Sequence, residues 1–80
     1  MDDKDRLRKL VEVLTSAIVE DKDSVAVDAF DDGAAITLSV SVALDDMGRL
    51  IGKKGRVASA LRTVVRAASG DRDVNVDIID

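Results

Sequence analysis

The feature that most constrains the fold is the way the hydrophobic periodicity changes along the chain. Within residues 36–42, aliphatic side chains alternate strictly with smaller or hydroxylated ones, and this period of two predicts a strand with one face on a core. A shorter alternating run covers residues 25–29, and the Asp-Asp-Gly at 31–33 predicts a hairpin connection between the two strands. Residues 74–78 alternate in the same way and predict a third strand near the C-terminus.

Three other segments have helical periodicity. An amphipathic helix is predicted over about 5–20, with aspartates in front of it that suit its dipole. A short helix is predicted over 46–51, with Asp45 as its N-cap and a stop at Gly52. A longer helix begins around Arg56 and ends at residue 70, where glycine suits a C-terminal cap. The pattern of this last helix predicts that one side is apolar: Val57, Ala60, Leu61, Val64, Val65 and Ala68.

The predicted element order is α-β-β-α-α-β, which gives an α+β fold. Eighty residues suffice for one domain, so residues 1–80 are expected to share a single core. The two helices between the second and third strands form a connection long enough for a crossover, so those strands can lie parallel. The hairpin adds an antiparallel strand, and we expect a three-stranded mixed sheet with the helices packed on one face.

The composition removes many classes of function. The chain has no cysteine and no histidine, which excludes disulfides, thiolate or imidazole metal sites and histidine-based catalysis. The aspartate pairs are better explained by a turn and a helix cap than by a metal site, so we expect no catalytic residues, no metal and no cofactor. No apolar stretch is long enough for a membrane span, and the acidic start, Met-Asp-Asp-Lys, does not resemble a secretory signal. We therefore expect a cytoplasmic protein that is not an enzyme.

The charge is distributed unevenly along the chain. Residues 47–70 contain six bases and no acid, whereas the other 56 residues hold all sixteen acids and six bases, a net charge of −10. An acidic body repels polyanions everywhere except at such a basic region, which favours one defined docking site.

The sequence Gly52-Lys53-Lys54-Gly55 lies inside this basic region, between the two predicted crossover helices. Glycines permit unusual backbone conformations and leave no side chain to keep a ligand away. The lysines add two cations, and the next helix begins there with free N–H groups and a positive dipole end. Close backbone approach, cations and N–H donors together suit a phosphodiester.

The segment resembles the GxxG motif of KH domains, and the element order resembles the type II, bacterial arrangement. The eighteen residues 51–68 are similar to the core of the small stand-alone bacterial KH proteins of the KhpA type, although Val57 and Leu61 stand where that family often has Ile. The resemblance covers the whole chain, and implies a single type II KH domain over residues 1–80 with its GxxG loop at 52–55.

The resemblance implies binding of single-stranded RNA, with about four nucleotides held in a narrow groove that has an aliphatic floor. By this resemblance the 52–55 loop, formed by Gly52, Lys53, Lys54 and Gly55, holds the sugar-phosphate backbone. Ile51 and Val57 flank the loop as groove or core positions. Arg49 and Arg56 are expected to be auxiliary phosphate contacts, and Arg62 and Arg66 are equally well explained as a solvated helix face.

The resemblance also implies an RNA chaperone or post-transcriptional regulator that forms a homodimer, or a heterodimer with a larger Jag-type, KhpB-like KH protein. Two alternatives stay open at this point. A helix-turn-helix DNA-binding module would place the arginines of 56–66 in a major groove. A protein-interaction adaptor would bind RNA only weakly.

Overall fold

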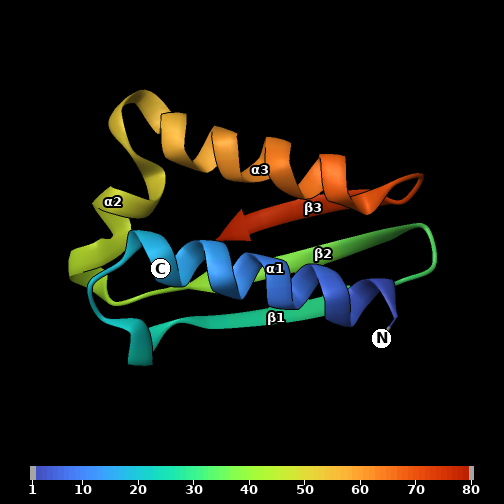
Figure 1. Cartoon of the computed structure of the whole chain (residues 1–80), viewed down its shortest axis with the longest axis horizontal. Coiled ribbons are helices and arrows are strands. Elements are labelled where there is room, and N and C mark those ends of the chain that lie inside the picture. The colour runs from blue at the N-terminus through green and yellow to red at the C-terminus, as the bar shows by residue number, and fades with distance from the viewer. Residues whose placement is uncertain (1, 80) are drawn as a thin grey trace.

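The computed structural model describes residues 2–79, which form six regular elements in the predicted order (Figure 1). These are α1 (Asp3–Ile18), β1 (Ala26–Asp31), β2 (Ala35–Ser41), α2 (Met47–Ile51), α3 (Arg56–Ser69) and β3 (Asp73–Ile78). Single turns of 3-10 helix at Lys22–Ser24, Leu44–Asp46 and Lys53–Gly55 lie in the connections. The α+β class and the α-β-β-α-α-β order are confirmed.

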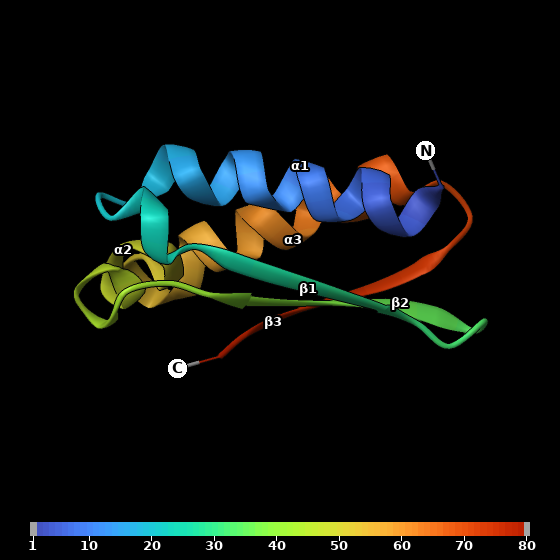
Figure 2. The ribbon, with the colours of Figure 1, turned by 90° about the horizontal axis from the view of Figure 1, so that it is seen from below.

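The sheet is mixed and has the strand order β1-β2-β3. β1 pairs antiparallel with β2, with Ala29 opposite Leu38, and β2 pairs parallel with β3, with Leu38 opposite Val76. The parallel pair is possible because the chain crosses over through α2 and α3 before it returns as β3. Figure 2 shows α1 and α3 on one face of the sheet and no element of the described chain on the other.

The core lies between the sheet and the helices and is built from aliphatic side chains. β2 shows the alternation that the sequence predicts, because Ile36, Leu38 and Val40 are fully buried while their neighbours are only partly covered. The largest of the other fully buried side chains come from the helices: Leu7, Val11, Leu50 and Val65. Across residues 2–79, no helix is both long and apolar enough to span a bilayer.

The hairpin between β1 and β2 depends on its aspartates. The Asp31 carboxylate accepts a hydrogen bond from the Gly33 N–H (2.9 Å), and the Asp32 carboxylate accepts from the N–H groups of Ala34 and Ala35 (2.9 and 2.8 Å). Such bonds from aspartate to the following backbone stabilise tight turns. The prediction that 31–33 forms a turn is therefore confirmed, although β1 continues through Asp31.

The predicted role of Asp45 as the N-cap of α2 is wrong. The residue before α2 is Asp46, whose side chain does not cap that helix. Asp46 is instead 3% exposed, and its carboxylate accepts hydrogen bonds from the N–H groups of Glu20 (3.1 Å) and Asp21 (3.0 Å). These bonds connect the corner after α1 to the start of α2, and they lower the pKa of the Asp46 carboxyl because they stabilise its charged form.

The predicted apolar side of α3 is rotated relative to the side that faces the core. Ala58, Leu61, Val65 and Ser69 are the buried residues, whereas Ala60 is exposed and Val64 is 46% exposed. Ser69 can be buried because its hydroxyl lies within hydrogen-bond distance of two carbonyl oxygens. The apolar residues left outside the core lie on the side of α3 that faces α1.

Candidate functional site

The connection between α2 and α3 has an unusual backbone. Gly52 has φ 77° and ψ 173°, Lys54 has φ 58° and ψ 25°, and Gly55 has φ 74° and ψ 15°. The conformation of Gly52 is one that only glycine adopts readily, and the other two are left-handed. Hydrogen bonds from the Gly52 N–H to the Gly48 carbonyl (2.9 Å) and from the Gly55 N–H to the Gly52 carbonyl (3.1 Å) close the turn. The loop is therefore tight and defined by its backbone.

The two glycines are needed for different reasons. A Cβ at Gly52 would lie 2.8 Å from the Val57 backbone nitrogen and would collide with the Val57 side chain. A Cβ at Gly55 would meet no atom within 4 Å, although the φ there is positive. Gly52 is thus required by packing inside the protein, whereas the space beside Gly55 is open to a ligand.

The cations of the loop are exposed and unpaired within the described chain. Lys53, Lys54 and Arg56 are all exposed and make no ion pair among residues 2–79. α3 starts at the same place, with no side-chain cap at Gly55 and no acid in its first turn. Because the start of a helix carries partial positive charge, cations there repel it, and a bound anion would relieve that repulsion.

Arg49 differs from the other predicted phosphate contacts because its charge is already paired with carboxylates of the protein. Its guanidinium lies 2.7 Å from the Glu20 carboxylate and 3.5 Å from the Asp46 carboxylate. Its predicted contact with RNA stays a prediction, and would require the guanidinium to leave or share these partners. No local pattern in the sequence indicates this pairing, since Glu20 lies 29 positions away.

The two apolar residues beside the loop have different environments. Ile51 is 41% exposed at the end of α2. Val57 is half-buried, packs against Gly52 and contributes to an apolar groove of about 170 Å³ between α1 and α3. The groove is lined by Leu14, Ile18, Val57, Ala60, Leu61 and Val64. The sequence indicated these side chains as core, but not that they form an open groove beside the loop.

The opposite side of α3 faces β3 and is polar. The Arg62 Nε–H donates to the Val76 carbonyl oxygen (3.1 Å), so this side chain bridges α3 to the outer edge of β3. Arg66, one turn further on, is exposed and makes no ion pair in the described part of the chain. Arg62 therefore has a structural contact that a solvated helix face would not require.

The chain has the element order α-β-β-α-α-β, a three-stranded mixed sheet and a Gly-x-x-Gly loop between the two crossover helices. Together these features define a type II KH domain. Comparison with known families places the chain more narrowly. The family model described as "KhpA/KhpB, KH domain" matches residues 8–79, and the chain belongs to this family.

Several curated relatives support the assignment. The chain is 47% identical over 76 residues to the RNA-binding protein KhpA of Halalkalibacterium halodurans, covering 92% of this chain and 100% of the relative. It is 44% identical over 70 residues to the protein of the same name from Mycobacterium tuberculosis, covering 88% and 86%. The corresponding protein of Streptomyces coelicolor is 43% identical over 74 residues, covering 92% of both chains. No solved structure gives a significant match.

Proposed function

We propose that this chain binds single-stranded RNA and that the 52–55 loop holds the sugar-phosphate backbone. The observation that carries the proposal is the start of α3, where Gly52 and Gly55 have positive φ, the space beside Gly55 is open and the helix has no side-chain cap. Three exposed cations at this point, Lys53, Lys54 and Arg56, make no ion pair among residues 2–79. The relatives are named RNA-binding proteins, which supports RNA as the anion. In KH domains a GxxG loop of this kind clamps about four nucleotides.

The role of each residue follows from its place. Gly55 lets the ribose-phosphate approach the backbone, and Lys53, Lys54 and Arg56 neutralise phosphates. Gly52 acts indirectly, because it allows Val57 to pack beneath the loop. Ile51 offers an exposed apolar surface next to the loop for a base.

We also propose that the protein is a non-catalytic RNA chaperone or post-transcriptional regulator that acts with a second KH protein. One short domain has a small footprint on RNA, so pairing with another copy or a KhpB-like partner would add affinity through effective concentration. The family, whose description includes KhpB, supports this choice of partner.

The helix-turn-helix alternative fits the fold poorly. Its DNA-contacting face would include Arg62, which instead bonds to β3. If two or three phosphates are neutralised at the loop, log affinity for single-stranded RNA should fall with log salt at a slope of roughly −1.5 to −2. A steeper slope together with a preference for duplex DNA would favour the alternative.

The proposal is tested by the double variant Lys53→Asp/Lys54→Asp, with RNA titration and circular dichroism on one sample. Both side chains are exposed, so the fold should be unchanged while RNA binding is lost. The matched control is Lys4→Asp/Lys9→Asp, which makes the same change of net charge on α1. Unchanged affinity in the folded loop variant would overturn the proposal, and equal losses in both variants would show that only the net charge matters.

A further inference from the structure

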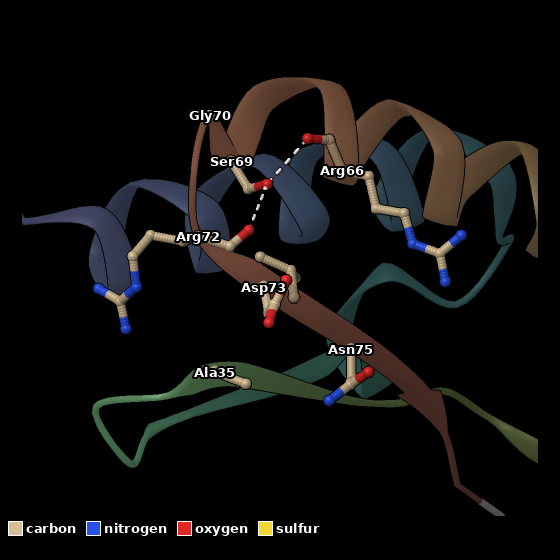
Figure 3. A pocket seen from close by; sticks show the side chains of 8 residues that line it. Ala35, Arg66, Ser69, Gly70, Arg72, Asp73 and Asn75 are labelled. Atoms are coloured by element: carbon tan, nitrogen blue, oxygen red, sulfur yellow. Dashed lines mark hydrogen bonds between the residues drawn. The ribbon is translucent and has the colours of Figure 1, made fainter.

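A second recess lies at the far end of α3 from the 52–55 loop. It has a volume of about 500 Å³ and is open to solvent. The last turn of α3, the turn at Gly70 and the first half of β3 surround it (Figure 3). Its lining shares no residue with the 52–55 loop or with the apolar groove beside that loop.

The recess is held in a fixed shape by contacts within the protein. The Ser69 hydroxyl lies 2.8 Å from the Arg66 carbonyl oxygen and 3.0 Å from the Arg72 carbonyl oxygen, which ties the end of α3 to the start of β3 (Figure 3). The Arg72 guanidinium pairs with the Asp31 carboxylate at 2.6 Å and anchors the same turn to the β-hairpin. The recess is therefore preformed, which lowers the entropy lost when a ligand binds.

The walls of the recess offer both hydrogen-bond donors and acceptors. Figure 3 shows the Arg66 side chain projecting from α3, whereas the Asp73 and Asn75 side chains project from β3 on the side away from α3. All three residues line the recess. The Arg66 charge has no ion-pair partner among residues 2–79, and Asn75 is exposed. An amide side chain both donates and accepts, a carboxylate accepts, and a guanidinium suits a phosphate.

The backbone of β3 adds a further donor and acceptor. The Val76 carbonyl points away from β2, because it accepts the bond from Arg62 on the outer edge of the sheet. Backbone groups of alternate residues in a strand face the same edge, so the N–H and C=O of Val74 also face outward. The Val74 side chain is buried, so it is this backbone that lines the recess.

The position of the recess relates it to the loop. Arg66 lies eleven residues after Gly55 on the same helix, about 16 Å along its axis. Arg62 lies between them and connects α3 to β3. A strand of RNA that leaves the loop along α3 and β3 would thus reach the recess after passing Arg62.

We propose that this recess binds one nucleotide of the same single-stranded RNA, beyond those held near the 52–55 loop. Arg66 binds its phosphate, while Asn75 and the Val74 backbone bind the edge of its base. The Asp73 carboxylate favours a base with an exocyclic amino group, so adenine, cytosine or guanine is preferred over uracil, which has only carbonyl oxygens and a ring N–H at that edge. This inference rests on the proposed function of the loop.

The test compares RNA oligonucleotides of four, six and eight nucleotides by fluorescence anisotropy. The parent protein should bind the octamer about tenfold more tightly than Arg66→Ala or Asn75→Ala does, while all three bind the tetramer equally. The affinity of the two variants should rise from tetramer to octamer only because a longer strand offers more positions at which the loop can bind. Lys9→Ala removes an equal charge from α1 and should behave as the parent, and thermal melts establish that each variant is folded.

The outcomes separate the two proposals. A parent protein that binds none of the oligonucleotides would overturn the proposed function itself. A parent that binds the tetramer, with both recess variants binding the octamer as tightly as the parent, would overturn the recess alone. In the parent, octamers that place uracil at every position beyond the fourth should bind more weakly than those with adenine there, and equal binding would overturn the role of Asp73 and Asn75 in base recognition.

Discussion

The two long helices begin in opposite ways. At the start of α1, the Asp2 carboxylate accepts a hydrogen bond from the Asp5 N–H (2.8 Å), and Asp3 and Asp5 lie in the first turn. At the start of α3, Gly55 provides no cap and the first turn contains Arg56 and no acid. An acid near a helix start contributes about 0.3–1 kcal/mol, and a good N-cap about 1 kcal/mol. The start of α3 has neither the N-cap nor the acid, so it lacks both stabilising contributions.

The difference shows how a helix end can serve stability or binding. At the start of α1 the Asp5 N–H is already bonded to the Asp2 carboxylate, and Asp3 and Asp5 add negative charge, so that end has little to offer an outside anion. The start of α3 keeps its positive potential because its first turn contains no acid and Lys53, Lys54 and Arg56 make no ion pair among residues 2–79. The comparison therefore predicts that changes at the two helix starts affect stability and RNA binding in different proportions.

The largest effect is expected for Gly52→Ala. The added Cβ would collide with Val57 and would require a φ of 77° from alanine. We expect the free energy of unfolding to fall by about 2–4 kcal/mol in urea titrations, from steric overlap and backbone strain together. Gly48→Ala is the matched control, because a Cβ at that helical glycine meets no atom within 4 Å, and it should leave stability equal or higher. Equal losses of stability in Gly52→Ala and Gly48→Ala would show that the start of α3 does not depend on the backbone geometry of the loop.

The next effect concerns the open space beside Gly55. Asparagine tolerates the left-handed conformation better than other residues with a side chain, so Gly55→Asn should stay folded. Its side chain would occupy the space where the proposal puts the ribose-phosphate, and we expect RNA affinity to fall about tenfold, as for loss of a close polar contact. Normal melting together with unchanged affinity would mean that RNA does not pass over Gly55.

Asp46 provides a third test, because it does for the N–H groups of Glu20 and Asp21 what Asp2 does for α1. Its pKa is lowered in the folded protein, mainly by those two hydrogen bonds. A lowered folded pKa means that the contribution to stability is complete above the unfolded pKa of about 3.9 and is lost as the pH falls through the lower folded value. Asp46→Asn should thus lower the melting temperature by about 5 °C at pH 7, and the difference from the parent should shrink as the pH falls below about 4.

The exposed neighbour Asp45 supplies the control for this test. Asp45→Asn removes the same charge one position away, without touching the corner after α1. We expect its melting temperature to follow that of the parent at every pH. If Asp46→Asn lowers the melting temperature by the same amount at every pH, the effect comes from packing and not from the charge of the carboxylate.

The fold was predictable because its elements differ in period. Alternation over 36–42 and over 74–78, helical spacing elsewhere, and a crossover of adequate length lead to one arrangement of the three strands. The 52–55 loop was also visible in the sequence, since two lysines flanked by glycines interrupt the helical pattern at one point inside the basic region. These features depend on neighbours along the chain, which a sequence displays directly.

The parts that could not be predicted depend on contacts between distant residues. Which side of α3 faces the core depends on how α1 packs beside it, so Val64 has the spacing of a core residue but lies in a groove. Asp46 lies in the first turn of the helix that the sequence predicts over 46–51, yet its hydrogen-bond partners lie about 25 positions earlier. The pairing of Arg49 with Glu20 has the same origin. The buried side of a helix and the partners of a distant side chain depend on tertiary packing, which leaves no local pattern in the sequence.

The smallest effect tests the comparison of helix starts most directly, by exchanging their charges. Arg56→Glu puts an acid in the first turn of α3, where it would interact favourably with the helix dipole and with the nearby lysines. We expect the free energy of unfolding to rise by about 0.5–1 kcal/mol while RNA affinity falls severalfold. Asp3→Arg is the mirror variant on α1, where it removes the Asp3–Arg6 ion pair and a favourable dipole interaction. It should lower stability by a similar amount without weakening RNA binding, because α1 starts away from the loop (Figure 1). If instead Arg56→Glu lowers both stability and affinity, the positive charge at the start of α3 supports the fold, and the helix start is not kept open for an anion.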